Sequence, residues 1–382
     1  MGCRNDFIVC LFIFSFMLIS QLATALPKNE YLTEKLLKVF PYQLPEGVKQ
    51  NILNLGVSKR YLINHYNSEM VMSETGIVDL CLEACKEAIE KACLSVRDIS
   101  YFVAACDTNP FLCPGLSHLL VRKIGFHPYI RHANVQGIAS TAFPNVLELA
   151  GNYLAAHPED YVLLCVSGVS SYWFQNQVRG IRDVREIDQI NIIKNKAKRQ
   201  TELRKWIATM EFFLFGDGAA AAIVANKGEG LTVRKIVQVT NIGKKDYLAG
   251  YARLSALNEP FKFGFYSHLD KKIPELGVKY TTLALKKLLG KNLEKTIKTA
   301  RKWAVHTGSE KILNALAEHH GIQHEKIRES QKTLKEYGNL AGASLPFILE
   351  KMLSSTRFTN DDVILMLGYG WGFSASAAQL NF

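Results

Sequence analysis

Two short segments in the last third of the chain decide how its fold is interpreted. They read Lys302-Trp-Ala-Val-His-Thr-Gly-Ser309 and Tyr337-Gly-Asn-Leu-Ala-Gly-Ala-Ser-Leu-Pro346. In the first, an apolar run ends at His306 and is soon followed by a glycine, which is typical of a strand that turns into a helix. Strand ends in α/β folds carry reactive side chains, because the sheet is rigid and its edge is open to ligands. The pattern therefore makes His306 a candidate site residue.

The second segment places Asn339 after a glycine and before a run of small residues, which let backbone or ligand approach closely. A histidine and an asparagine at two element starts could polarise one carbonyl oxygen together. Each residue also has a plainer interpretation, His306 as a packed core side chain and Asn339 as a helix N-cap. The residues alone leave both interpretations open.

Three further motifs accompany these two along the chain. They are Pro114-Gly115 followed by a leucine-rich helix and Gly125-Phe-His-Pro128, Leu214-Phe-Gly-Asp-Gly-Ala-Ala-Ala221, and Gly368-Tyr-Gly-Trp-Gly-Phe-Ser374. The five motifs together resemble the thiolase superfamily, with chalcone-synthase-like type III polyketide synthases and ketoacyl synthase III as the nearest branches. The resemblance covers roughly residues 15–382.

The resemblance implies an α/β protein with a thiolase-like duplicated five-layer αβαβα fold. Strands and helices alternate in two similar stretches, which supports a duplication. We place the N-terminal half at residues 1–230, with a basic insertion near 174–210, and the C-terminal half at residues 231–382. Apolar spacing predicts helices within 29–52 and 73–94, and the polar stretch 240–272 is expected to be an irregular loop.

The N-terminal segment allows two interpretations. Phe7–Ser20 is apolar, follows Arg4 and precedes Ala23-Thr-Ala25, as in a signal peptide with its cleavage site. Met17–Pro27 instead resembles the family's opening strand, whose removal would take a central strand from the first sheet. We predict the strand, with Phe7–Phe14 as an added hydrophobic leader, and a cytoplasmic protein. The alternative location is at a membrane, through that hydrophobic N-terminus.

The net charge and the cysteine content limit the classes of partner and metal that we expect the chain to bind. The chain has 46 basic and 35 acidic residues, a net charge of +11. No nucleic-acid-binding motif accompanies this charge, so nucleic acid is not an expected partner, whereas acidic thioester carriers such as coenzyme A or acyl carrier protein fit it. The eight cysteines include no C-x-x-C pair, which argues against a zinc site. We expect no metal and no cofactor other than the thioester substrate.

The position of the family's nucleophile is the main departure. In the family, a cysteine follows the glycine that ends the strand His132–Gly137, at a helix N-terminus that depresses the thiol pKa. Here Ile138 follows that glycine, and a shift of one residue would place Ala139 there, which supplies no nucleophile either. Ser140 and Thr141 come one to two positions late, and we expect them to cap or pack.

The resemblance also implies the cavity walls. The loop Thr108–Pro114, with Cys113 at its tip, resembles the loop that reaches into the partner subunit's cavity in type III synthases. Phe215 resembles the aromatic residue that gates the tunnel, and Gly370 and Trp371 lie in the loop that shapes the cavity. The basic residues of the 174–210 insertion form either a solvated face or a docking surface for an acidic carrier protein or an anionic membrane surface.

By resemblance, His306 and Asn339 bind a malonyl thioester carbonyl and stabilise the enolate that decarboxylation produces. Three functions follow from a site that keeps this pair and lacks the cysteine. The first is an acyltransferase of condensing type acting on acyl and malonyl thioesters, and the second is a malonyl-thioester decarboxylase. The third is a non-catalytic subunit paired with a cysteine-bearing homologue. The family's habit predicts a homodimer or a heterodimer.

Overall fold

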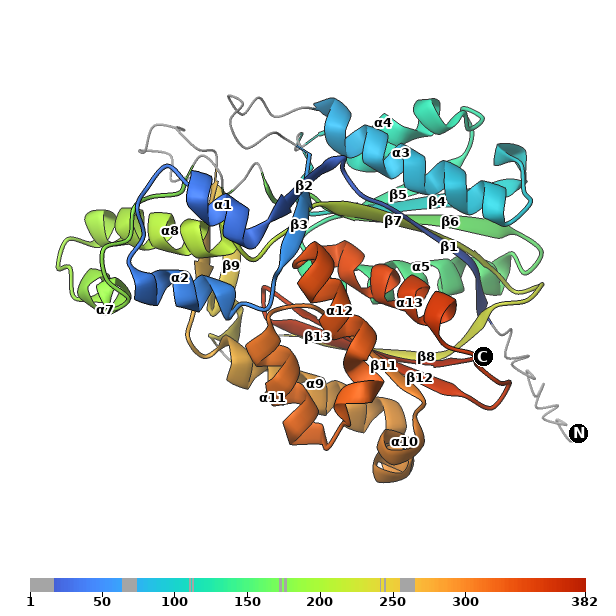
Figure 1. Cartoon of the computed structure of the whole chain (residues 1–382). Helices are drawn as coiled ribbons and strands as arrows, with labels where there is room; N and C mark the ends of the chain where they lie inside the picture. The colour runs from blue at the N-terminus through green and yellow to red at the C-terminus, as the bar shows by residue number, and fades with distance from the viewer. Residues whose placement is uncertain are drawn as a thin grey trace, which may run out of the picture.

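A computed structural model describes residues 17–63, 74–109, 111, 113–171, 174, 177–240, 242–243, 245–254 and 265–382. Its centre is one mixed sheet with the strand order β11-β12-β13-β8-β1-β7-β6-β4-β5 (Figure 1). These strands are β1 Met17–Ala25, β4 Ile99–Cys106, β5 Arg131–Val135, β6 Tyr161–Gly168, β7 Gly218–Ala225, β8 Leu231–Thr240, β11 Lys302–Val305, β12 Val363–Gly370 and β13 Ser374–Asn381. Two small hairpins pair β2 Asn29–Leu32 with β3 Lys59–Leu62, and β9 Gly250–Leu254 with β10 Phe265–Leu269.

The helices cover both faces of this sheet and fill the space between its two halves. They are α1 Thr33–Val39, α2 Glu46–Leu53, α3 Glu74–Lys91, α4 Leu116–Ile124, α5 Ala142–Ala156, α7 Glu186–Asn191, α8 Lys196–Phe212, α9 Ile273–Leu289, α10 Leu293–Thr299, α11 Glu310–His320, α12 Arg328–Tyr337 and α13 Ser344–Ser355. Strands β6 and β7 are near-continuous runs of buried apolar residues, as expected where both faces of a sheet are covered.

Five layers result, and Figure 1 shows them stacked from top to bottom. Helices α3 and α4 pack on the outer face of the N-terminal strands, and α9, with α11 against it, packs on the outer face of the C-terminal strands. Helices α5 and α13 lie between the two halves of the sheet. Strand pairing repeats: β1-β7-β6-β4 and β8-β13-β12-β11 each run antiparallel, antiparallel, parallel. The predicted duplicated five-layer fold is confirmed; the boundary at 230/231 stays a prediction.

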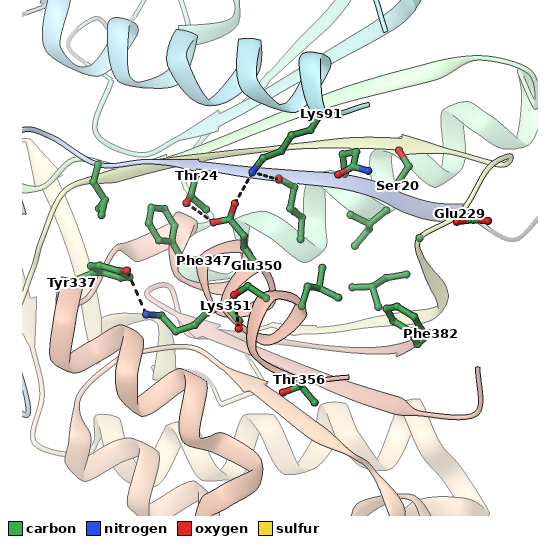
Figure 2. Close-up of a pocket in the computed structure, with 18 residues that line it drawn as sticks. Ser20, Thr24, Lys91, Glu229, Tyr337, Phe347, Glu350, Lys351, Thr356 and Phe382 are labelled. Atoms are coloured by element: carbon green, nitrogen blue, oxygen red, sulfur yellow. Dashed lines mark hydrogen bonds and ion pairs between the residues drawn. The ribbon is translucent and has the colours of Figure 1, made fainter. Parts of the chain in front are cut away.

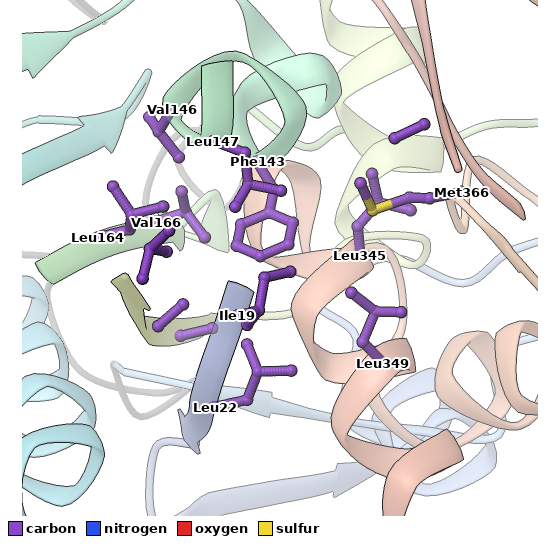
Figure 3. Close-up of a cluster of buried hydrophobic side chains, with 14 of the residues drawn as sticks. Ile19, Leu22, Phe143, Val146, Leu147, Leu164, Val166, Leu345, Leu349 and Met366 are labelled. Atoms are coloured by element: carbon purple, nitrogen blue, oxygen red, sulfur yellow. The ribbon is translucent and has the colours of Figure 1, made fainter. Parts of the chain in front are cut away.

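The core between the halves is built from both repeats. Phe143 of α5 and Leu345 of α13 meet there with Ile19 of β1, and all three are at least 97% buried (Figure 3). At about 25 cal/mol per Å² of apolar surface removed from water, burial of this kind is the main force that joins the two halves.

Strand β1 joins the two halves of the sheet, and we call it the seam. Its first three residues pair with Leu231–Val233 of β8, and most of its length pairs with β7. The strand predicted at Met17 is therefore confirmed, whereas the Phe7–Phe14 leader lies outside the described residues. No helix in the described part of the chain is both long and apolar enough to cross a bilayer.

Two other local predictions need correction. The stretch 29–52 begins with strand β2 before its two helices, because Asn29–Leu32 pairs edge to edge with β3. The stretch 240–272 contains the β9–β10 hairpin, because its aromatic and apolar residues form a short ladder rather than an irregular loop. The insertion near 174–210 contributes α7 and α8, and α8 packs with α1 and α2 around buried Phe212 and Phe213.

Candidate active site

One cavity of about 550 Å³ brings the predicted site residues together. His306, Asn339, Phe215, Gly370 and Trp371 all line it. A larger cavity of about 670 Å³ opens elsewhere, between β1 and α13 (Figure 2). There Lys91 Nζ contacts Glu350 Oε1 at 3.1 Å, and Thr24 Oγ1 donates to Glu350 Oε2 at 2.5 Å. Because none of the predicted residues lines this larger cavity, the smaller cavity is the candidate active site.

His306 stands immediately after β11, where its own N–H continues the ladder by donating to the Leu367 carbonyl at 2.9 Å. The ring packs edge-on against Tyr369, with centroids 5.1 Å apart, and Tyr369 Oη donates to the His306 carbonyl at 3.2 Å. The side chain is 98% buried, and this burial lowers its pKa to about 3. The imidazole is therefore neutral at physiological pH.

Only one nitrogen of that ring can serve a ligand. Nδ1 of His306 is buried and has no hydrogen-bond partner among the described residues. A buried N–H without an acceptor is rarer, and costs more stability, than a buried ring nitrogen that accepts no hydrogen bond. We therefore assign the proton to Nε2. The ring then presents Nε2–H as a donor to the cavity that it lines.

Asn339 is fixed on three sides. Its N–H donates to the Leu214 carbonyl at 2.9 Å, its carbonyl accepts from Gly216 N–H at 3.2 Å, and it forms a parallel bridge with Phe215. Its side-chain Oδ1 accepts from Ala341 N–H at 2.9 Å. The amide group is therefore oriented with Nδ2 away from its own turn, and Nδ2 has no hydrogen-bond partner within the part of the chain that the structure describes.

Two glycines make this bridge between the halves sterically feasible. A Cβ on Gly216 would lie 2.1 Å from the Tyr337 carbonyl oxygen, and one on Gly168 would lie 2.0 Å from the Leu340 carbonyl oxygen. Beside them, the buried Asp217 carboxylate accepts from the N–H groups of Ser170 and Ser171 at 2.9 and 3.0 Å. The Leu214–Ala221 motif thus fixes Asn339, and its first two residues, Leu214 and Phe215, also line the cavity.

At the turn of the family's nucleophile, the residue that faces the cavity is Ala139. Ala139 lines the cavity, whereas Ile138 packs against the core between the sheet halves. Ala139 has φ +45°, and Ala341, which stands in the equivalent place before α13, has φ +47°. Ser140 also lines the cavity, and Thr141 is buried with its Oγ1 donating to the Ile138 carbonyl at 2.6 Å; its side chain does not cap α5. The atom presented at the centre of the turn is a methyl carbon.

Asp107 is a site residue that the sequence analysis missed. It lines the cavity, and its Oδ1 accepts from Gly137 N–H at 2.5 Å and from Ile138 N–H at 3.3 Å. Burial raises the pKa of this carboxyl, and the backbone donors of the turn partly oppose that rise. Two backbone amides of this turn are therefore engaged by a side chain. Its place directly after a buried strand was the signal that could have found it.

Glu211 is a second missed residue, one position before the end of α8. It is 99% buried, lines the cavity and accepts from Ser267 Oγ at 2.5 Å. Burial raises the pKa of Glu211 to about 8, against a smaller lowering by Ser267. No sequence pattern marked it, because an acid on a basic helix resembles a solvated residue.

The remaining predicted residues divide between the wall and the surface. Phe215 packs on Phe174 with ring centroids 5.2 Å apart. Trp371 approaches Gly250, whose carbonyl accepts from Gly372 N–H at 2.9 Å. Cys113 is exposed and is not among the described residues that line the cavity of this chain; its expected place in a partner's cavity stays a prediction. Across the described residues, no cluster of three or more histidine, cysteine or acidic side chains could hold a metal.

Comparisons with known proteins find similar sequences and structures over most of the chain. The family described as 3-oxoacyl-[acyl-carrier-protein (ACP)] synthase III C terminal matches residues 294–382, which include His306 and Asn339. The 3,5-dihydroxyphenylacetyl-CoA synthases of Amycolatopsis orientalis and Streptomyces toyocaensis are 24% and 26% identical over 367 and 380 residues, covering 91% and 93% of this chain and 89% and 88% of theirs. A beta-ketoacyl-[acyl-carrier-protein] synthase III of Clostridium perfringens is 25% identical over 333 residues, covering 85% of this chain and 88% of its own.

Solved structures share the whole fold. The 1,3,6,8-tetrahydroxynaphthalene synthase of Streptomyces coelicolor A3(2) superposes with a TM-score of 0.77 at 19% identity, and a fungal type III polyketide synthase with 0.76 at 17%. Each superposition covers 96% of this chain and 99% of the other. The chain is thus similar in sequence to 3,5-dihydroxyphenylacetyl-CoA synthases and to a ketoacyl synthase III, and it shares its fold with type III polyketide synthases.

Proposed function

We propose that the chain is a condensing-type enzyme that binds malonyl and acyl thioesters and decarboxylates the malonyl thioester without forming an acyl-enzyme. The observation that carries the proposal is one cavity lined by His306, Asn339 and Ala139. A neutral histidine and an asparagine amide that line one cavity support enolate chemistry, and a methyl group at the turn supports the absence of covalent loading.

The reaction needs only these donors. The thioester carbonyl oxygen accepts hydrogen bonds from His306 Nε2–H and Asn339 Nδ2–H. The bond between the α-carbon and the carboxylate carbon breaks and carbon dioxide leaves. The electron pair of the broken bond stays with the α-carbon and is delocalised onto the thioester oxygen as an enolate. Protonation of the α-carbon from solvent then gives the acetyl thioester. A neutral histidine suits this role, since it donates without bringing a charge that would hold the carboxylate in place.

The apolar wall of the cavity favours release of the malonyl carboxylate as neutral carbon dioxide. Phe215 and Phe174 form an apolar surface directly beside the Asn339 bridge. A carboxylate against such a surface is poorly solvated, and decarboxylation relieves that cost by releasing a neutral molecule.

We propose coenzyme A or acyl carrier protein as the substrate carrier, and an assembly that is a homodimer or a heterodimer. The net charge of +11 suits an acidic carrier. The exposed basic side chains that precede and open α8, among them Lys194 and Lys196, are available for its docking. Static light scattering at micromolar concentration should give twice the chain mass, alone or with a homologue; a clean monomer in both cases would contradict the dimer.

The test is release of carbon dioxide from malonyl-CoA by the full chain. We expect slow release that falls by two to three orders of magnitude in His306→Ala and Asn339→Ala, the usual scale for an oxyanion donor. His319→Ala and Asn314→Ala, on the exposed side of α11, are matched controls that should retain the rate. Intact-mass measurement with acetyl-CoA should show no adduct; an adduct on Ser140 or Cys113 would reveal another nucleophile.

Asp107 favours a second candidate, a non-catalytic subunit that pairs with a cysteine-bearing homologue. Its carboxylate occupies the amides of the turn, which removes one means of stabilising a reaction there. No detectable decarboxylation by the native chain, and no difference in His306→Ala, would favour this subunit role over the enzyme.

A further inference from the structure

Glu211 is a buried acid that the reaction above does not use. The side chain is 99% buried and lines the cavity together with Met210, Leu214 and Phe174. Among the described residues no basic side chain acts on the pKa of this carboxyl, so none of them compensates a negative charge there. A carboxyl group in such surroundings is held in its neutral form.

The hydrogen bonding of Glu211 is half complete. Ser267 Oγ, on strand β10 across the cavity wall, donates to Oε2 at 2.5 Å. Oε1 is buried and has no partner among the described residues. Because Oε2 acts as the acceptor, the acid proton belongs on Oε1, which then presents an O–H donor without an acceptor.

An unpaired donor of this kind asks for an explanation. Leaving a buried O–H without an acceptor costs stability, and a leucine would fill the same space without that cost. The backbone of Glu211 is fixed in place, since its carbonyl accepts from Leu214 N–H and Phe215 N–H, both at 2.9 Å. The carboxyl is thus anchored in the same short segment that bridges to Asn339.

We propose that Glu211, held by Ser267, is a specificity-determining subsite that hydrogen-bonds a neutral oxygen, keto or hydroxyl, on the acyl chain of the thioester. This subsite rests on the proposed function, because it names the substrate class of the same cavity. An acyl chain with such an oxygen completes the bonding of Oε1, whereas a plain hydrocarbon chain leaves it unpaired. A site built around a hydrogen bond rejects analogues that lack the partner.

Binding of matched thioester pairs to the full chain tests this subsite without any turnover. The pairs are acetoacetyl-CoA with butyryl-CoA, and 4-hydroxyphenylacetyl-CoA with phenylacetyl-CoA, each differing by one oxygen. Calorimetry should show a preference of about tenfold or more for the oxygenated member of at least one pair. Glu211→Gln keeps a donor and an acceptor and should keep most of the preference. Glu211→Leu, which buries favourably and should fold, should abolish it, and Ser267→Ala should reduce it.

Infrared difference spectra provide a second readout. A band from a protonated carboxyl should be present in the native chain, absent in Glu211→Gln, and shifted when the preferred thioester binds. Equal affinities within both pairs, or a preference that survives in Glu211→Leu, would overturn the subsite while leaving the proposed function intact. Failure of every thioester to bind would overturn both.

Discussion

Ala139 combines a strained backbone with an unreactive side chain. Its φ of +45° is unfavourable for any residue with a Cβ, and it persists because the turn between β5 and α5 is held by surrounding contacts. Strain of this kind gathers at functional sites, and at this turn the residue that bears it presents only a methyl group to the cavity. A cysteine there would add no strain beyond that which alanine already bears.

Introducing a thiol at this turn should allow the chain to be acylated, and the rate of acylation should depend on which of two adjacent positions carries the thiol. We expect Ala139→Cys to be acylated by acetyl-CoA at least about tenfold faster than Ile138→Cys, because position 139 faces the cavity and position 138 faces the core. Intact mass followed by peptide mapping measures this. Faster loading of Ile138→Cys would mean that the alignment of the glycine with the family's motif, not the cavity wall, identifies the nucleophile position.

Adding Asp107→Asn to Ala139→Cys should speed acylation further. The carboxylate at the amides opposes the helix N-terminus that would otherwise stabilise a thiolate. Lowering a thiol pKa by one unit raises the thiolate fraction about tenfold but lowers its nucleophilicity, so the net gain is about threefold. No change would mean that Asp107 does not influence a thiol at this turn.

The pH dependence of stability should report Glu211 independently of any ligand. Its pKa of about 8 in the folded chain lies above the value of 4.5 for an exposed side chain, so the folded state holds the proton more tightly. Stability is then lost as pH rises from about 4.5 to about 8, by at most about 1.4 kcal/mol per pH unit. Glu211→Gln removes this loss, so its advantage in urea unfolding should grow from pH 5 to pH 8. An advantage that stays constant, as expected for the exposed control Glu318→Gln, would contradict it.

At the scale of elements, the site depends on how closely two backbone segments approach. The bridge between Phe215 and Asn339 requires a glycine at position 216. Gly216→Ala should push the Tyr337 carbonyl away, displace Asn339, and lower both the melting temperature and the rate of decarboxylation, the latter about tenfold or more. Gly277→Ala is the control, since its Cβ would meet only ordinary contacts inside α9. That helix should gain about 0.5–1 kcal/mol. Equal behaviour of the two variants would show that the bridge is dispensable.

The sequence predicted those elements whose patterns are local. His306 and Asn339 could be found because each follows a recognisable strand or glycine turn, and β6 and β7 because they are long apolar runs. Ile138 was identified from its neighbour Gly137, but the sequence does not reveal which of two adjacent residues points into a cavity. Glu211 and Ser267 could not be found, because they belong to a helix and a hairpin that meet only in three dimensions.

For the molecule as a whole, the two repeats do not merely pack but share one sheet. The pairing of β1 with both β7 and β8 makes the sheet continuous across the repeat boundary. The cavity lies between the same two halves, so its geometry depends on their relative position. Loss of the seam should therefore affect folding and site together.

Truncation tests this dependence. Removing residues 1–25 deletes β1, exposes the unpaired edges of β7 and β8, and takes Ile19 and Leu22 from the core between the halves. Each buried aliphatic side chain of this kind is worth about 1.5–3 kcal/mol, so the loss of several exceeds the 5–15 kcal/mol that a domain typically has once the ladder hydrogen bonds are included. We expect no soluble folded protein from a chain that begins at Leu26, whereas removal of residues 1–8 should leave a cooperative unfolding transition by circular dichroism. A stable chain from Leu26 would show that the halves associate without the seam, and it would favour the signal-peptide interpretation of the N-terminal segment.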